Sequence, residues 1–215
     1  MEKLAQKLAH RIAQNLGYDP EREAVIAYGL IAMIQVSVTV LLVFLLGLLA
    51  GVPVESLIVC FSASILRKYS GGAHAETAEL CSAISAVYCT ATAVLAKTIL
   101  TVLYHPIFMS IVSVAIYGIS FLLIARFAPV DSPNKPIRTE KKRKRMRKGS
   151  FITMTVYVAL SALLFALSSS YDFGKSYAIS MLFGISWQVF TLTTLGSRFI
   201  GKMNAIFILR KGVLR

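Results

Sequence analysis

The sequence predicts an all-α integral membrane protein with about six transmembrane helices and an N-terminal amphipathic surface helix. Its 215 residues are 56% hydrophobic and only 15% charged, whereas a soluble domain carries roughly 25% charged residues. The apolar residues come in blocks close to the length that an α-helix needs to cross a bilayer. Lys and Arg gather between alternate blocks, as expected when they face the cytoplasm.

The first seventeen residues predict an amphipathic helix. Apolar side chains recur at every fourth position and basic side chains form a stripe beside them, in the sets Leu4, Leu8, Ile12, Leu16 and Lys3, Lys7, Arg11. Such a helix either lies on the membrane surface or docks on the protein's own core. Gly17 is expected to end it, with Asp19 as N-cap and Pro20 as first residue of the next helix.

The rest of the chain is expected to complete a single polytopic domain over residues 1–215. The apolar block Val54 to Leu66 is short, so it predicts either a short span or a re-entrant segment. We count it as crossing, because the basic residues that follow the fourth block would otherwise lie outside. The expected parts are a helix at 1–17, four spans within 24–125, a basic cytoplasmic loop at 126–149, two spans within 150–197 and a basic tail at 198–215.

This layout predicts a multi-pass protein of a bacterial cell membrane, with both termini and the polar stretch 67–81 in the cytoplasm. The net charge of +13 is then explained by orientation and by anionic lipid, and not by nucleic acid. The densest charge run is KKRKRMRK at 141–148, which can also attract an acidic peptide. Arg67, at the membrane edge, is expected to bind either a lipid headgroup or a substrate carboxylate.

The stretch Arg67 to Cys81, RKYSGGAHAETAELC, holds polar and reactive side chains between two apolar blocks. Cys81 and His74 form a candidate pair, because a thiol becomes a strong nucleophile only as a thiolate, which a nearby imidazole can generate. On one straight helix the two would lie about 10.5 Å apart. The Gly71-Gly72 pair allows His74 to lie in a loop that folds back over the helix bearing Cys81. Thr77 is expected to cap that helix.

Other interpretations of these residues remain open. A cysteine in a membrane helix commonly serves as a small packing residue, which is what we expect for Cys60 and Cys89. A zinc site needs three or four ligands, and the spacing of the candidates is awkward, so we expect no metal and no cofactor. Those candidates are His74, Glu76, Glu79 and Cys81.

The stretch R-K-Y-S-G-G-A-H-A-E-T-A-E-L-C resembles the motif of the accessory gene regulator B (AgrB) family, membrane endopeptidases of bacterial peptide quorum sensing. The family's Arg, Gly, His and Cys correspond to Arg67, Gly72, His74 and Cys81. A second similarity is Ala128-Pro129 followed by N-K-P-I at 134–137. Length, span layout and charge also agree, so the resemblance covers nearly the whole chain.

The resemblance implies a cysteine endopeptidase that acts on an AgrD-type propeptide with an amphipathic leader, a central Cys or Ser, and an acidic tail. Cys81 would attack the bond before the tail, with His74 as base and then acid. The peptide's own thiol or hydroxyl would then close a thiolactone or lactone. The resemblance also implies a homodimer.

A further set of residues is expected to bind substrate or support the dyad. Glu76 or Glu79 would orient His74, and Arg67, Ser70 or backbone N–H groups near Gly72 would stabilise an oxyanion. The basic run would capture the acidic tail. The full set is Arg67, Ser70, Gly71, Gly72, Glu76, Lys135, Lys141, Lys142 and Arg143.

The main alternative is a multi-span transporter or exporter of a small peptide without proteolytic activity. Lys97 lies within an apolar block, and intramembrane charges often mark transport paths. However, the sequence indicates no acid in another span that pairs with it, and Lys97 can extend toward the outer surface. A non-catalytic scaffold or lipid-binding protein would explain the basic run, but not a His and a Cys beside paired glycines.

Overall fold

The computed structural model is a helical bundle that describes residues 1–73, 75–131, 137, 139–171 and 173–213. No strand occurs within these ranges, so the prediction of an all-α membrane protein is confirmed. The helices are α1 (Glu2–Leu16), α2 (Pro20–Leu49), α3 (Pro53–Ser70), α4 (Ala78–Val94), the π-helix η1 (Leu95–Leu100), α5 (Pro106–Phe127), α6 (Glu140–Leu167), α7 (Phe173–Phe190) and α8 (Thr194–Val213).

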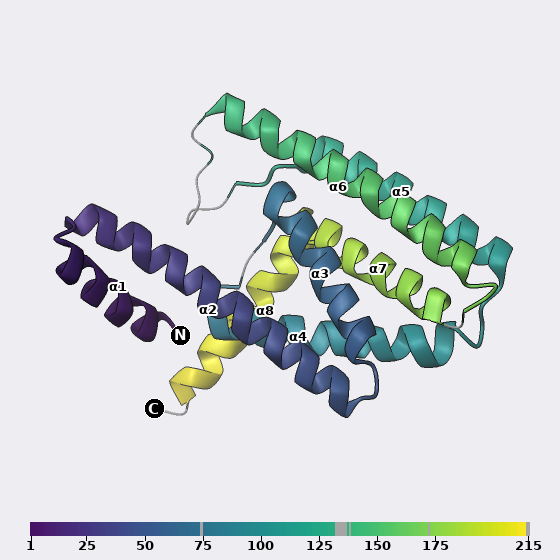
Figure 1. Cartoon of the computed structure of the whole chain (residues 1–215), viewed down its shortest axis with the longest axis horizontal. Coiled ribbons are helices and arrows are strands. Elements are labelled where there is room, and N and C mark those ends of the chain that lie inside the picture. The colour runs from purple at the N-terminus through teal and green to yellow at the C-terminus, as the bar shows by residue number, and fades with distance from the viewer. Residues whose placement is uncertain (74, 132–136, 138, 172, 214–215) are drawn as a thin grey trace.

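The long helices are arranged around α3 and α7, which pack against each other (Figure 1). The helices α1 and α2 form a hairpin on one side, and α5 and α6 form a pair on the other. Two tyrosines connect the layers through hydrogen bonds inside the core. The Tyr117 hydroxyl donates to the Tyr157 carbonyl oxygen (2.9 Å), and the Tyr157 hydroxyl donates to the Ser62 carbonyl oxygen (3.0 Å).

Four of the described helical segments are long and apolar enough to cross a membrane: α2, the continuous segment Ala78–Leu100, α5 and α6. The pair α7 and α8 forms a fifth candidate, bent by 87° at its break. The helix α3 is not among them, because Glu55, Arg67 and Lys68 lower its hydropathy. The predicted count of six spans therefore stays a prediction.

The amphipathic helix α1 packs on α2 through a face of small residues. Ala5, Ala9 and Ala13 are fully or almost fully buried. The apolar stripe of the same helix stays exposed; it consists of Leu4, Leu8, Ile12 and Leu16. Gly17 ends α1 with a φ of 64°, and the Asp19 side chain accepts the Arg22 N–H at 2.8 Å, so both predicted boundaries are confirmed. The helix thus docks by its alanines and keeps an apolar face suited to a membrane surface.

Two boundaries differ from the prediction. The basic run 141–148 was expected in a loop, but it forms the first turns of α6, because the Thr139 hydroxyl caps the helix and Glu140 pairs with Lys144 at 3.0 Å. The last two spans were expected within 150–197, with a tail from 198. The last apolar helix, α7, ends at Phe190, and the Thr193 hydroxyl accepts the N–H of Gly196 where α8 begins.

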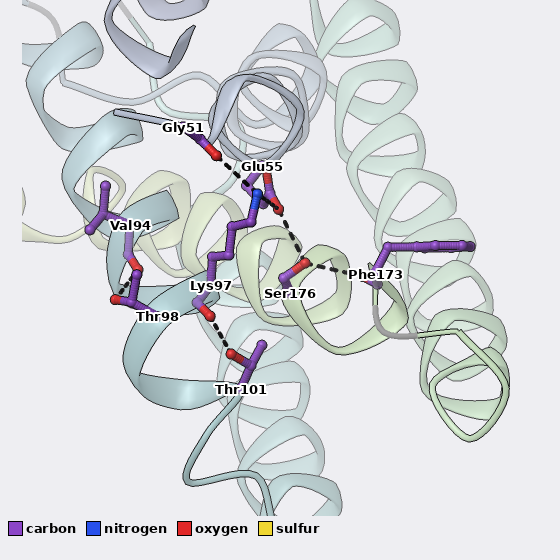
Figure 2. A network of polar contacts seen from close by, with 8 residues as sticks. All are labelled: Gly51, Glu55, Val94, Lys97, Thr98, Thr101, Phe173 and Ser176. Carbon is purple, nitrogen blue, oxygen red and sulfur yellow. Dashed lines mark hydrogen bonds and ion pairs between the residues drawn. The ribbon is translucent and has the colours of Figure 1, made fainter. Parts of the chain in front are cut away.

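A polar cluster joins α3, η1 and α7 at the start of α3 (Figure 2). Lys97 Nζ lies 3.4 Å from Glu55 Oε1 and donates to the Gly51 carbonyl oxygen at 2.9 Å. The Ser176 hydroxyl donates to the same Glu55 oxygen at 3.3 Å. Glu55 is only 4% exposed. The expectation that Lys97 has no acidic partner in another span is therefore wrong, because the partner stands close to the start of α3.

We expect Lys97→Met to destabilise the protein, because it leaves the buried Glu55 carboxylate without its countercharge. Lys97 is half exposed, so the loss of unfolding free energy is expected to be about 1–3 kcal/mol, between the values for exposed and buried pairs. Thermal unfolding in detergent micelles measures it. Lys144→Met, which breaks the exposed pair with Glu140, is the matched control and should change stability little. Equal stability of both variants would contradict this role for the pair.

Candidate active site

Cys81 lies in the first turns of α4, where the loop after α3 re-enters the bundle. The Thr77 hydroxyl accepts the Leu80 N–H at 3.2 Å, so the predicted cap is confirmed. The Cys81 N–H donates to the Thr77 carbonyl oxygen at 3.1 Å. Of the chain's three cysteines, Cys60 and Cys89 are buried and only Cys81 is partly exposed. It is therefore the thiol that a reactant can reach most readily.

Cys81 lines an open cavity of about 440 Å³, whose other lining residues come from α1, α2, α3, α4, α6, α7, the loop between α3 and α4, and the segment between α5 and α6. The same cavity reaches Cys89, which lies eight residues further along α4, about 12 Å away. Its lining combines charged and apolar side chains. Arg67 and Lys68 from the last turn of α3 and Lys142 from the first turn of α6 supply positive charge, Glu2 and Glu76 supply acidic groups, and Val36 and Val40 of α2 supply apolar surface.

Gly71 and Gly72 permit the loop after α3 to run close to two other segments. Their φ angles are +69° and +134°, which side chains disfavour. A Cβ on Gly71 would overlap the Val130 carbonyl oxygen, and a Cβ on Gly72 would lie 2.6 Å from Thr191 Oγ1. The glycine pair thus serves close approach as well as the loop conformation that the sequence predicts.

Arg67 connects this loop to Cys81. Its guanidinium donates to the Ala73 carbonyl oxygen, lines the cavity and is close enough to Cys81 for an electrostatic interaction. A fixed positive charge in this place stabilises negative charge on sulfur or on a nearby oxyanion. Ser70 is different, because it is fully buried and its hydroxyl donates to the Leu66 carbonyl oxygen. It is not among the cavity-lining residues.

Two predicted site residues, His74 and Lys135, lie outside the described residues. The neighbours of His74 are described. Ala75 lines the cavity, and Ala73 lines a small adjoining recess that also includes Cys81. The loop segment that carries His74 therefore borders the cysteine.

The other predicted residues are brought to the site only in part. Glu76 lines the cavity, whereas Glu79 contacts the Met1 amine at 2.9 Å. Of the three basic candidates in α6, Lys142 lines the cavity, and Lys141 and Arg143 are exposed beside it. Within the described ranges, no three His, Cys, Asp or Glu side chains gather closely enough to hold a metal ion.

The second sequence motif is brought next to the first. The Ala128-Pro129 peptide is cis, and the Val130 N–H after it donates to the Ser70 carbonyl oxygen at 2.9 Å. Val130 and Ile137 line the same cavity as Cys81. The described parts of the two motifs thus contribute to one site.

Several residues at the site were not found from the sequence. Gln188 and Trp187 of α7 line the cavity. Thr191 and Asn204 contact the loop between α3 and α4. Gln188 is a polar amide in an apolar block, which is the kind of signal that marks functional positions in membrane segments.

The fold and the cavity define a membrane protein whose polar site, built around one accessible cysteine, lies at one end of a helical bundle. The chain belongs to the accessory gene regulator B family, whose model matches residues 5–192, so the resemblance is confirmed. This family takes part in accessory gene regulator quorum sensing.

Relatives support the same assignment. AgrB-like protein 2 of Clostridium perfringens strain 13 is 36% identical over 199 residues, which cover 92% of this chain and 93% of the relative. An AgrB-like protein of C. perfringens strain SM101 shows the same identity and coverage. One from Halalkalibacterium halodurans is 26% identical over 213 residues, covering 99% of this chain and 96% of the relative. No solved structure matches the chain.

Proposed function

We propose that the protein is a membrane cysteine endopeptidase with a His74–Cys81 dyad. It removes the C-terminal tail of an AgrD-type propeptide and lets the remainder close into a thiolactone or lactone. The observation that carries the proposal is the position of Cys81. This partly exposed cysteine lines a cavity beside Arg67, next to the loop that bears His74.

The reaction has two acyl transfers. His74 removes the Cys81 proton, the thiolate attacks the carbonyl carbon before the tail, and the C–N bond breaks as His74 returns the proton to the leaving amine. A thioester now joins the peptide to Cys81. The thiol or hydroxyl of the peptide attacks this thioester, transfers its proton through His74 and releases Cys81. Arg67 stabilises the negative charge on sulfur and oxygen in both steps.

In the second step, water competes with the peptide's own thiol or hydroxyl for the thioester, so a cavity that excludes water favours ring closure. Hydrolysis of the thioester would release a linear peptide, whereas transfer to another thiol conserves the thioester bond. Apolar side chains from α2, such as Val36 and Val40, line the same cavity as Cys81. A lining of this kind limits water around the acyl-enzyme.

The cavity lining offers complementary surfaces to the two sides of the bond. Its basic residues Arg67, Lys68 and Lys142 attract an acidic tail, and its apolar side chains accept the segment on the other side of the bond. The bond to be cleaved then lies over Cys81.

The proposed location follows from the positive-inside rule. The site, both termini and the basic run face the cytoplasm of a bacterial cell, where the basic run also meets anionic lipid. The family resemblance also implies a homodimer. Chemical crosslinking in membranes with an amine-reactive reagent, under reducing conditions, tests it. A monomer band alone would reject the dimer without affecting the dyad.

The transporter alternative is weaker than the sequence indicated. Its main support was Lys97 as a lone intramembrane charge, and Lys97 is paired with Glu55. An ion pair between a buried carboxylate and a half-exposed lysine also occurs as a structural contact.

We expect Cys81→Ala and His74→Ala to abolish tail removal, because the first removes the nucleophile and the second the base. Each variant is co-expressed with the AgrD-type propeptide encoded nearest to the gene, and the peptide is followed by mass spectrometry. Ser82→Ala changes the next residue of α4, which is not among the cavity-lining residues, and should retain cleavage. Membrane insertion is checked for all three. Tail removal by Cys81→Ala would reject the proposed mechanism.

Reversing the charge of Lys141, Lys142 and Arg143 to Glu should raise KM for the propeptide more than it lowers kcat, because these residues bind the tail before the chemical step. Initial rates in proteoliposomes separate the two constants. Reversing Lys3, Lys7 and Arg11 provides a control with the same change of residue types and net charge. Unchanged kinetics, or an equal effect of both triple variants, would contradict a specific role for the basic run.

A further inference from the structure

The loop that carries His74 is held by the last residues of α7. Gln188 Nε2 donates to Ser70 Oγ at 3.0 Å and to the Gly71 carbonyl oxygen at 2.6 Å. Both acceptors stand where the chain leaves α3. The amide thus fixes the direction in which the loop starts, three residues before His74.

Two further contacts continue along the same loop. The Ala73 N–H donates to the Thr191 carbonyl oxygen at 3.0 Å, and the Glu76 N–H donates to Asn204 Oδ1 at 3.1 Å. These bonds flank His74 on both sides. Since Asn204 belongs to α8, the bend between α7 and α8 brings both helices to the loop.

Gln188 is fully buried, and Thr191 is 2% exposed. A buried amide is costly unless it is hydrogen-bonded, and an apolar side chain of equal size would fill the same space without that cost. The Gln188 amide donates to the last residue of α3 and to the first residue of the loop, where the chain leaves that helix. Packing of α7 alone therefore does not explain an amide at this position.

The loop depends on contacts with other segments for its conformation. Residues 71–73 and 75–77 belong to no helix, and a loop keeps one conformation only when contacts outside it are sufficient. Besides the contacts above, Arg67 and Val130 bind its backbone at Ala73 and Ser70. Arg67 is also needed at the reaction centre, whereas Gln188 can serve positioning alone.

We propose that Gln188 is a positioning residue for the dyad: it holds the start of the loop so that His74 meets Cys81. Thr191 and Asn204 assist it further along the loop. The inference rests on the proposed function, because it assigns a role in the same reaction. Displacements near 1 Å can reduce rates about 100-fold, so loss of the Gln188 contacts should lower kcat by about 10- to 100-fold.

The test compares Gln188→Met, which keeps the shape without donors, with Gln188→Glu, which replaces the NH2 donor group by a carboxyl oxygen. Two quantities are measured. They are kcat and KM for tail removal, and the pH dependence of Cys81 alkylation by iodoacetamide without substrate. Ser180→Ala is the control, because Ser180 is buried on the same helix two turns earlier.

We expect both Gln188 variants to lower kcat with KM within about threefold of the wild type, since positioning acts on the chemical step. The pH profile of Cys81 alkylation should move toward that of His74→Ala, and Ser180→Ala should change neither quantity. Ser70→Ala removes one acceptor from the loop side. Ser70→Ala should therefore lower kcat by a smaller factor than the Gln188 variants. If the Gln188 variants fail to insert in the membrane, this variant still tests the inference.

Wild-type kcat and alkylation in both Gln188→Met and Ser70→Ala would overturn the inference. A rise in KM alone would also overturn it, because Gln188 would then contact the substrate directly. These outcomes are separate from failure of the proposed function. If Cys81→Ala still cleaves the propeptide, the dyad is wrong, whereas an inactive Cys81→Ala with an active Gln188→Met rejects only the positioning role.

Discussion

The site depends on the close approach of one loop to two distant parts of the chain. The backbone at Gly71 and Gly72 lies too near to Val130 and Thr191 to carry a side chain. This contact brings the loop before α4 against the end of α7 and against the segment after α5. Arg67 can then reach the Ala73 carbonyl oxygen while it stays close to Cys81. A side chain at either glycine would separate these parts and open the cavity.

The helix α3 carries polar groups at both of its ends, and each end has a different task. Glu55 joins η1 and α7 at one end, whereas Arg67 serves the site at the other, twelve residues or about 18 Å away. Between them the helix packs closely on α7. This explains why a central helix of the bundle has too low a hydropathy to qualify as a span by composition. Glu55 and Arg67 have partners inside the protein, so the helix does not need a fully apolar sequence.

Features that depend on neighbouring residues were predictable from the sequence. The caps at Asp19 and Thr77, the end of α1 at Gly17 and the loop at the glycine pair follow from local chemistry, and the structure confirms them. The apolar blocks also located most of the membrane helices. Contacts between distant segments were not predictable, because nothing local links Gln188 to Gly71 or Lys97 to Glu55. The basic run was misplaced because its charges indicated a loop, although Lys and Arg are good helix formers and Thr139 supplies a cap.

The most direct test of the central claim is a search for the acyl-enzyme. The purified protein is mixed with a propeptide in which the ring-closing Cys or Ser is replaced by Ala, so that cyclisation cannot resolve the thioester. Intact-mass and peptide-mapping spectrometry then locate any adduct. The account predicts a mass increase equal to that of the propeptide without its tail, as the free acid, less one water, attached to Cys81 and removed by hydroxylamine. Tail removal without an adduct on Cys81, or an adduct on Cys60 or Cys89, would contradict it.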